Sequence, residues 1–119
     1  MNTVILDVQT LDDALATAMR VMETREPEPH ERISFASPEL MWRTLGGKRG
    51  ALVRTMCGAG PMSIREAARR VGRDVKSVHS DVHALLNAGV LWRTDDGRIE
   101  FPFDAIRVEF TIEPERSAA

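Results

Sequence analysis

The chain has 119 residues, of which 43% are hydrophobic and 29% charged, and its formal net charge is −2. This length suits one domain with an extension. No apolar run approaches the roughly 18 residues of a transmembrane helix, so we expect no membrane partner. The N-terminus lacks the basic and long apolar regions of a signal peptide. The single cysteine, Cys57, cannot form an internal disulfide, which favours a cytoplasmic location.

The charge is distributed unevenly along the chain. Residues 1–47 carry four basic and eight acidic side chains, residues 48–98 ten basic and five acidic, and residues 99–119 two basic and five acidic. The net charge alone argues against a nucleic-acid binder, but a local excess of positive charge is typical of a DNA-facing surface. We predict an N-terminal extension, residues 1–47, for dimerisation or partner contact, and a DNA-binding domain with a C-terminal strand, residues 48–119.

The N-terminal part predicts alternating strands and helices. The expected elements are a strand at 4–8, a helix capped by Thr10 and ending near Arg25, a polar connection at 25–32, a strand at 33–35, and a helix at 38–45 capped by Ser37. Leu11, Leu15, Ala18 and Met22 mark one apolar face of the first helix. We expect this face to pack on the strands.

Three further helices follow in the basic part. The first runs from about Lys48 to Cys57. The second begins at a capping box, Ser63 and Glu66, in which each side chain accepts a backbone N–H of the helix start, and it ends at Gly72. The third is capped by Asp74, runs to Asn87 and is closed by Gly89. Two helices joined by about three residues, with apolar faces that can meet, indicate a helix-turn-helix.

Two β-prone runs, 90–94 and 98–101, flank Asp96-Gly97, which is a strong hairpin signal. A hairpin with arginines near its tip, directly after a recognition-type helix, is typical of a wing. Residues 106–112 alternate strictly and predict a strand, and 113–119 a loose tail. This strand and the strand at 4–8 need partners, which are either each other or the same strands of a second copy.

The expected fold is therefore α+β: a winged helix-turn-helix, with a three-helix core and a β-hairpin wing, behind an N-terminal strand-helix-strand extension. The candidate DNA-binding residues lie on the second and third helices of the core, on the turn between them and on the wing. They are Arg65, Arg69, Arg73, Lys76, Ser77, His79, Ser80, His83, Arg93 and Arg98. Each arginine or lysine could be plain soluble surface, but set on this frame phosphate contact is the better interpretation. For Trp92 we favour packing over a dimer contact.

No catalytic or cofactor signature stands out. His79 and His83 have the i, i+4 spacing of a zinc motif, but Ser80 stands where that motif needs its glutamate, and no third ligand is evident. We therefore expect DNA-facing histidines, no bound metal, no cofactor and no enzyme activity.

The segment from Pro61 to Val82, the following LLNAGVL, the DDGR turn and the final FDAIRVEF together resemble the MarR-like winged-helix DNA-binding proteins of bacteria and archaea. The most specific part is Gly72–Val82, and the resemblance spans almost the whole chain. Members are often encoded beside toxin genes and act as antitoxins or transcriptional regulators. Trp92 and Ser80 depart from the residue types expected at their positions, which leaves operator sequence and partner choice open.

These observations predict a sequence-specific transcriptional regulator that binds double-stranded DNA as a homodimer, most simply as a repressor of its own promoter. The alternative is an interaction protein, such as an antitoxin that masks a neighbouring toxin with its acidic N-terminal segment or its strands. A subunit of a larger polymerase or chromosome machine fits less well, because the basic charge lies where DNA would bind.

Overall fold

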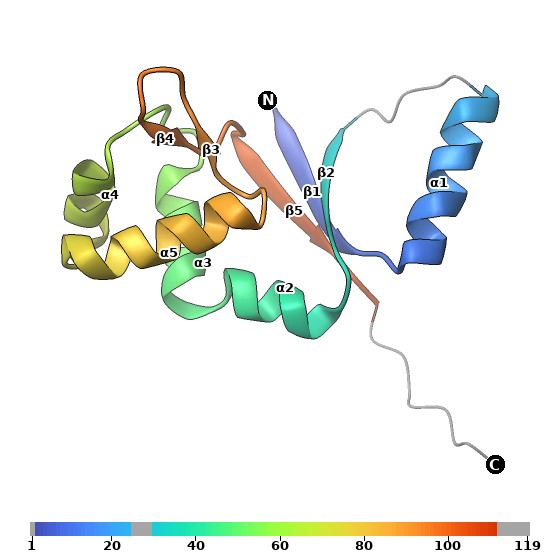
Figure 1. The fold of residues 1–119 in the computed structure, drawn as a ribbon, viewed down its shortest axis with the longest axis horizontal. Coiled ribbons are helices and arrows are strands. Elements are labelled where there is room, and N and C mark those ends of the chain that lie inside the picture. Colours follow the sequence, from blue (N-terminus) through green and yellow to red (C-terminus); the bar gives the residue numbers. More distant parts are fainter. Residues whose placement is uncertain (1, 25–29, 112–119) are drawn as a thin grey trace, which may run out of the picture.

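A computed structural model describes residues 2–24 and 30–111 (Figure 1). In these residues the fold is α+β, as expected, with five helices and five strands. The elements are β1 (Thr3–Val8), α1 (Leu11–Thr24), β2 (Glu31–Phe35), α2 (Pro38–Leu45), α3 (Gly47–Met56), α4 (Ile64–Val71), α5 (Val75–Asn87), β3 (Trp92–Arg93), β4 (Ile99–Glu100) and β5 (Ala105–Glu109).

The strands of the two chain ends form one parallel sheet in the order β2-β1-β5. The two terminal runs therefore pair with each other inside one chain, so their pairing supplies no reason for a dimer. Asn2 strengthens this junction, because its backbone carbonyl accepts from the N–H of Asp104 at 2.7 Å and its side chain donates to Pro102 at 2.9 Å. The two predicted parts of the chain thus share a sheet.

The two faces of this sheet differ in chemistry. Val4 and Leu6 point to the inner face, where they join one hydrophobic core with α2 and α3. The opposite, outer face carries a charged network around Asp7, whose carboxylate accepts from Arg32 at 2.7 Å and from the hydroxyl of Ser34 at 2.6 Å. The inner face is therefore apolar, whereas the outer face is mostly polar and has Ile5 as an apolar exception.

The expectation that α1 packs on the strands is wrong. No residue of α1 is buried, and Leu11, Leu15, Met19 and Met22 are 54–78% exposed. Figure 1 shows α1 across the sheet from α2 and α3. The physical reason is the outer face itself: an apolar stripe gains nothing from lying on carboxylates and guanidinium groups that need water or each other.

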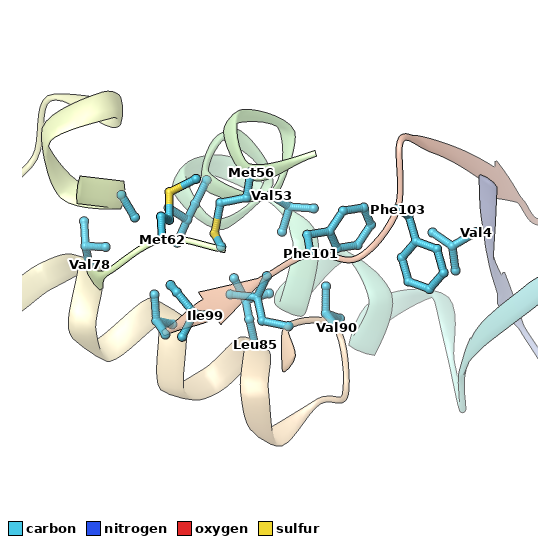
Figure 2. Close-up of a cluster of buried hydrophobic side chains, with 14 of the residues drawn as sticks. Val4, Val53, Met56, Met62, Val78, Leu85, Val90, Ile99, Phe101 and Phe103 are labelled. Carbon is cyan, nitrogen blue, oxygen red and sulfur yellow. The ribbon is translucent and has the colours of Figure 1, made fainter. Parts of the chain in front are cut away.

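The core of the molecule lies between α3, α4, α5 and the hairpin (Figure 2). Met56, Leu85, Ile99 and Phe101 are at most 1% exposed. Met62 forms an antiparallel bridge to Ile99, so the segment before α4 extends the β3-β4 hairpin. Through Phe101 and Phe103 the core continues to Val4 on the sheet, as Figure 2 shows.

Several predicted bounds need correction. The hairpin strands are only two residues each. The first strand is short because the N–H groups of Val90 and Leu91 donate instead to the carbonyl of Leu85 at the end of α5. The expected polar connection at 25–32 ends in strand, since Glu31 already belongs to β2. Residues 25–29 and the predicted tail lie outside the described residues. In the part described, no helix is long and apolar enough to span a membrane.

Candidate nucleic-acid interface

The helix-turn-helix is built by short-range capping. The hydroxyl of Ser63 accepts the N–H of Glu66 at 3.1 Å, and the carboxylate of Asp74 accepts the N–H of Ser77 at 2.9 Å. Between the helices, Gly72 adopts φ +70° and ψ +35°, a left-handed conformation that costs glycine little. This turn lets α5 pack across α4, so both helices bury their apolar faces in one core.

Only half of the predicted capping box forms. The carboxylate of Glu66 does not return to the helix start but receives Arg69 at 2.5 and 2.9 Å and Arg70 at 2.9 Å. These hydrogen bonds hold the pKa of Glu66 at about 2, so it is ionised under all physiological conditions. Arg69 is nevertheless highly exposed. Its guanidinium is held in place on the surface of α4 and remains accessible.

The outer face of α5 is polar and open to solvent. Lys76, His79, Ser80 and His83 are exposed, while Ser77 is half-buried at the first turn. His79 and His83 contact each other, with their Nε2 atoms 3.1 Å apart and their ring centroids 4.3 Å apart. Lys76 has no hydrogen bond or ion pair within the described residues, so its ammonium group is available to a ligand.

The wing carries two arginines close to its tip. Arg98 donates to the carboxylate of Asp96 at 2.8 Å, and Arg93 to the carbonyl of Gly97 at 3.3 Å. Gly97 itself has φ +84°, as the predicted turn requires. The hydroxyl of Thr94 and the guanidinium of Arg98 hold the pKa of Asp96 below its usual value. Both arginines are exposed, at the edge of the same hairpin.

Arg73 has a different environment from the other predicted DNA contacts. Its side chain is only 18% exposed, and its Nη2 lies 2.8 Å from Oδ2 of Asp81 on α5. Arg49 of α3 donates to the other oxygen of the same carboxylate at 3.0 Å. Burial alone would raise the pKa of Asp81, but the two arginines outweigh it and keep the pKa below its usual value. This cluster ties α3, the turn and α5 together.

Sequence reasoning missed Asp81 and Arg49. Asp81 sits among the polar residues of α5, and nothing in its spacing says that it faces two arginines from elsewhere. The ten predicted residues otherwise fall on α4, the turn, α5 and the wing as expected. Arg65 is exposed and, in the described parts of the chain, unpaired.

The arrangement places cations and hydrogen-bonding groups on two helices and a hairpin. Among the described residues, no three His, Cys, Asp or Glu side chains come together as a metal site would need. Cys57 is half-buried, and burial raises its thiol pKa, as does the charge of Asp104, so it is not an activated nucleophile.

Comparison with known proteins gives a match in the part of the chain that contains the helix-turn-helix and the hairpin. No curated protein and no solved structure matches the sequence. One family model does, over residues 44–108, which runs from the end of α2 through α3, α4, α5 and the hairpin into β5. Because this match covers more than half of the 119 residues, the chain belongs to the HVO_A0114 family.

Proposed function

We propose that this protein is a MarR-like, sequence-specific DNA-binding transcriptional regulator that acts as a homodimer and represses its own promoter. The observation that carries the proposal is the outer face of α5, where Lys76, His79, Ser80 and His83 are exposed beside the arginines of α4 and the wing. A helix that buries one face and presents short polar and cationic side chains on the other fits the major groove.

The supporting charges have separate roles in this proposal. Lys76 and Ser77 occupy the first turn of α5, where side chains of a recognition helix meet base edges. Arg65 and Arg69 on α4, and Arg93 or Arg98 on the wing, contact phosphates. Arg73 acts mainly through Asp81, by holding the start of α5 in position.

Two of the proposed phosphate contacts come from arginines that already form ion pairs within the chain. Arg69 is bound to Glu66 and Arg98 to Asp96, yet both guanidinium groups are largely exposed. An exposed ion pair contributes little to stability, so a phosphate can bind one edge of the guanidinium at small cost. Arg65 and Lys76 have no such competitor among the described residues.

The test is titration of the full-length protein into a duplex from its own upstream region and into a scrambled duplex of equal length. We expect tighter binding to the upstream duplex and a loss of that preference in Lys76→Ala. Arg20→Ala is the matched control, since it removes from α1, away from the helix-turn-helix, an exposed cation that has no ion pair among the described residues. Equal binding to both duplexes by the parent would overturn sequence-specific regulation and favour the alternative, in which the surface contacts protein.

A further inference from the structure

The exposed stripe of α1 is an anomaly for a helix with such a regular pattern. Leu11, Leu15, Ala18 and Met22 lie on one line of the helix, with Met19 beside them, at about 100° per residue. Leu11 and Met22 are more than three-quarters exposed. A stripe of this length on an otherwise polar helix marks an interaction surface.

Among the residues that the structure describes, no surface of the same chain receives the stripe. The nearest sheet face is the charged outer one, where Arg32 approaches Asp7 and Arg107 donates to Glu109 at 2.9 Å. The inner face is partly covered by α2 and α3 and lies on the far side of the sheet from α1. The link from β1 to α1 is two residues long, and the N–H of Gln9 is bound to the carbonyl of Phe35, which holds the start of α1 beside β2.

The same chain has an unfilled apolar groove of about 690 Å³ on the other side of the sheet. Its walls are Leu6, Ile106 and Val108 of the sheet and Trp42, Leu45 and Val53 of α2 and α3. Trp42 is 52% exposed and Val108 48% exposed. Figure 1 shows the sheet between α1 and the helices that line this groove, so α1 cannot fill the groove of its own chain.

The charges around the two surfaces are complementary. Asp12 and Glu23 lie on one flank of the stripe, beside Met19, at helical spacing. Arg54 lines the groove, and Arg43 and Lys48 adjoin the lining residues Trp42 and Gly47. These three cations have no side-chain hydrogen bond or ion pair in the described part of the chain. An acidic flank also separates α1 from helices that lie on membranes, whose polar faces are rich in Lys and Arg.

We infer that α1 of one copy docks into the groove between β5, α2 and α3 of a second copy, and the reverse, in a closed two-fold dimer. Reciprocal docking covers two stripes and two grooves, whereas pairing α1 with α1 leaves both grooves open and brings the acidic flanks together. Four apolar surfaces also come closer to the roughly 1,200–2,000 Å² that a stable interface buries. The symmetry is that of the commonest homodimers.

The test uses three full-length variants and sedimentation at tens of micromolar. Leu15→Glu places a charge in the stripe, Val108→Arg places one in the groove, and Arg20→Glu changes a charge on the face of α1 opposite the stripe. All three side chains are exposed in the single chain, so the fold should survive, which circular dichroism checks. We expect Leu15→Glu and Val108→Arg each to weaken self-association by roughly a hundredfold and Arg20→Glu to leave it unchanged.

Mixing provides the decisive measurement. A one-to-one mixture of Leu15→Glu and Val108→Arg retains one intact helix and one intact groove, and its other interface combines opposite introduced charges, so a heterodimer should form. A mixture that stays monomeric, or a variant that dimerises like the parent, would overturn reciprocal docking while leaving the proposed dimer intact. A monomeric parent would overturn the dimer as well, whereas DNA recognition is decided separately by the titrations above.

Discussion

Arg73 and Asp81 form the innermost ion pair of the helix-turn-helix, with Nη2 and Oδ2 2.8 Å apart and both side chains less than 20% exposed. Arg49 completes the cluster from α3, and Nη1 of Arg73 is buried with no hydrogen-bond partner among the described residues. Removing the carboxylate would leave two cations facing each other in a partly buried site. We therefore expect Asp81→Asn to lower the free energy of unfolding by about 2–3 kcal/mol in urea titrations.

The pH dependence of this loss distinguishes a charge effect from lost packing. The folded-state pKa of Asp81 lies below that of the unfolded chain, so its contribution is fully present above the unfolded value of about 3.9. It disappears as the pH falls through the lower folded value. The difference between the parent and Asp81→Asn should be constant from neutral pH to about pH 5 and shrink below it. A constant difference at all pH values would contradict the charge explanation.

Phosphate and base contacts should separate in their salt dependence. Arg69→Ala should weaken binding to every duplex alike and lower the slope of log K against log salt by about one unit per contact, doubled in a dimer. Lys76→Ala should cost about 1–3 kcal/mol per half-site on the upstream duplex and little on the scrambled one, if it reads a base. Equal losses on both duplexes for both variants would remove base reading by α5.

Two glycines should differ in how substitution harms the fold. A Cβ at Gly72 meets nothing within 4 Å, but φ is +70°, so Gly72→Ala should cost about 1 kcal/mol of backbone strain. A Cβ at Gly50 would overlap the carbonyl oxygen of Leu45, which is backbone and cannot turn aside. Gly50→Ala should therefore cost more, and the melting temperatures of the two variants give the order. Ala59→Gly, at an exposed loop position, is the comparison for a small change elsewhere.

The histidine pair should bind no stoichiometric metal in the purified protein. His79 and His83 share a contact at 3.1 Å between Nε2 atoms, but the described residues bring no third ligand to them. Two exposed imidazoles leave most coordination positions to water, which gives weak binding. Elemental analysis after dialysis should show well below one equivalent of zinc. One equivalent that is lost in His79→Ala and kept in His30→Ala would contradict this.

Local chemistry explains why so much of the fold could be predicted. Ser37, Ser63 and Asp74 each cap a helix where expected, and Gly72, Gly89 and Gly97 have the positive φ values that their turns require. These interactions join residues within a few positions of each other, so the sequence shows both partners. The charged segment that forms α3, α4, α5 and the wing was located for the same reason, and the family match falls on it.

Interactions between distant residues could not be predicted in this way. The alternation of residues 106–112 showed that this run would form a strand, and β5 does form there, but its pairing with β1 rests on contacts a hundred positions apart. The half-formed capping box has a different cause, because it is a local competition: Glu66 has three possible donors, and it binds the two arginines that follow it on its own helix.

By itself, then, the sequence determined the order and type of the elements, most of their caps, the α+β class and the position of the basic segment, since each depends on neighbours along the chain. Only the tertiary structure decided that Arg73 and Arg49 share Asp81, that β1 lies between β2 and β5, and that the stripe of α1 faces solvent. An apolar stripe shows that a helix carries side chains that are more stable when they are buried. Whether its own chain offers a matching surface depends on which face of the sheet carries the charges, and that is settled only when the strands have paired.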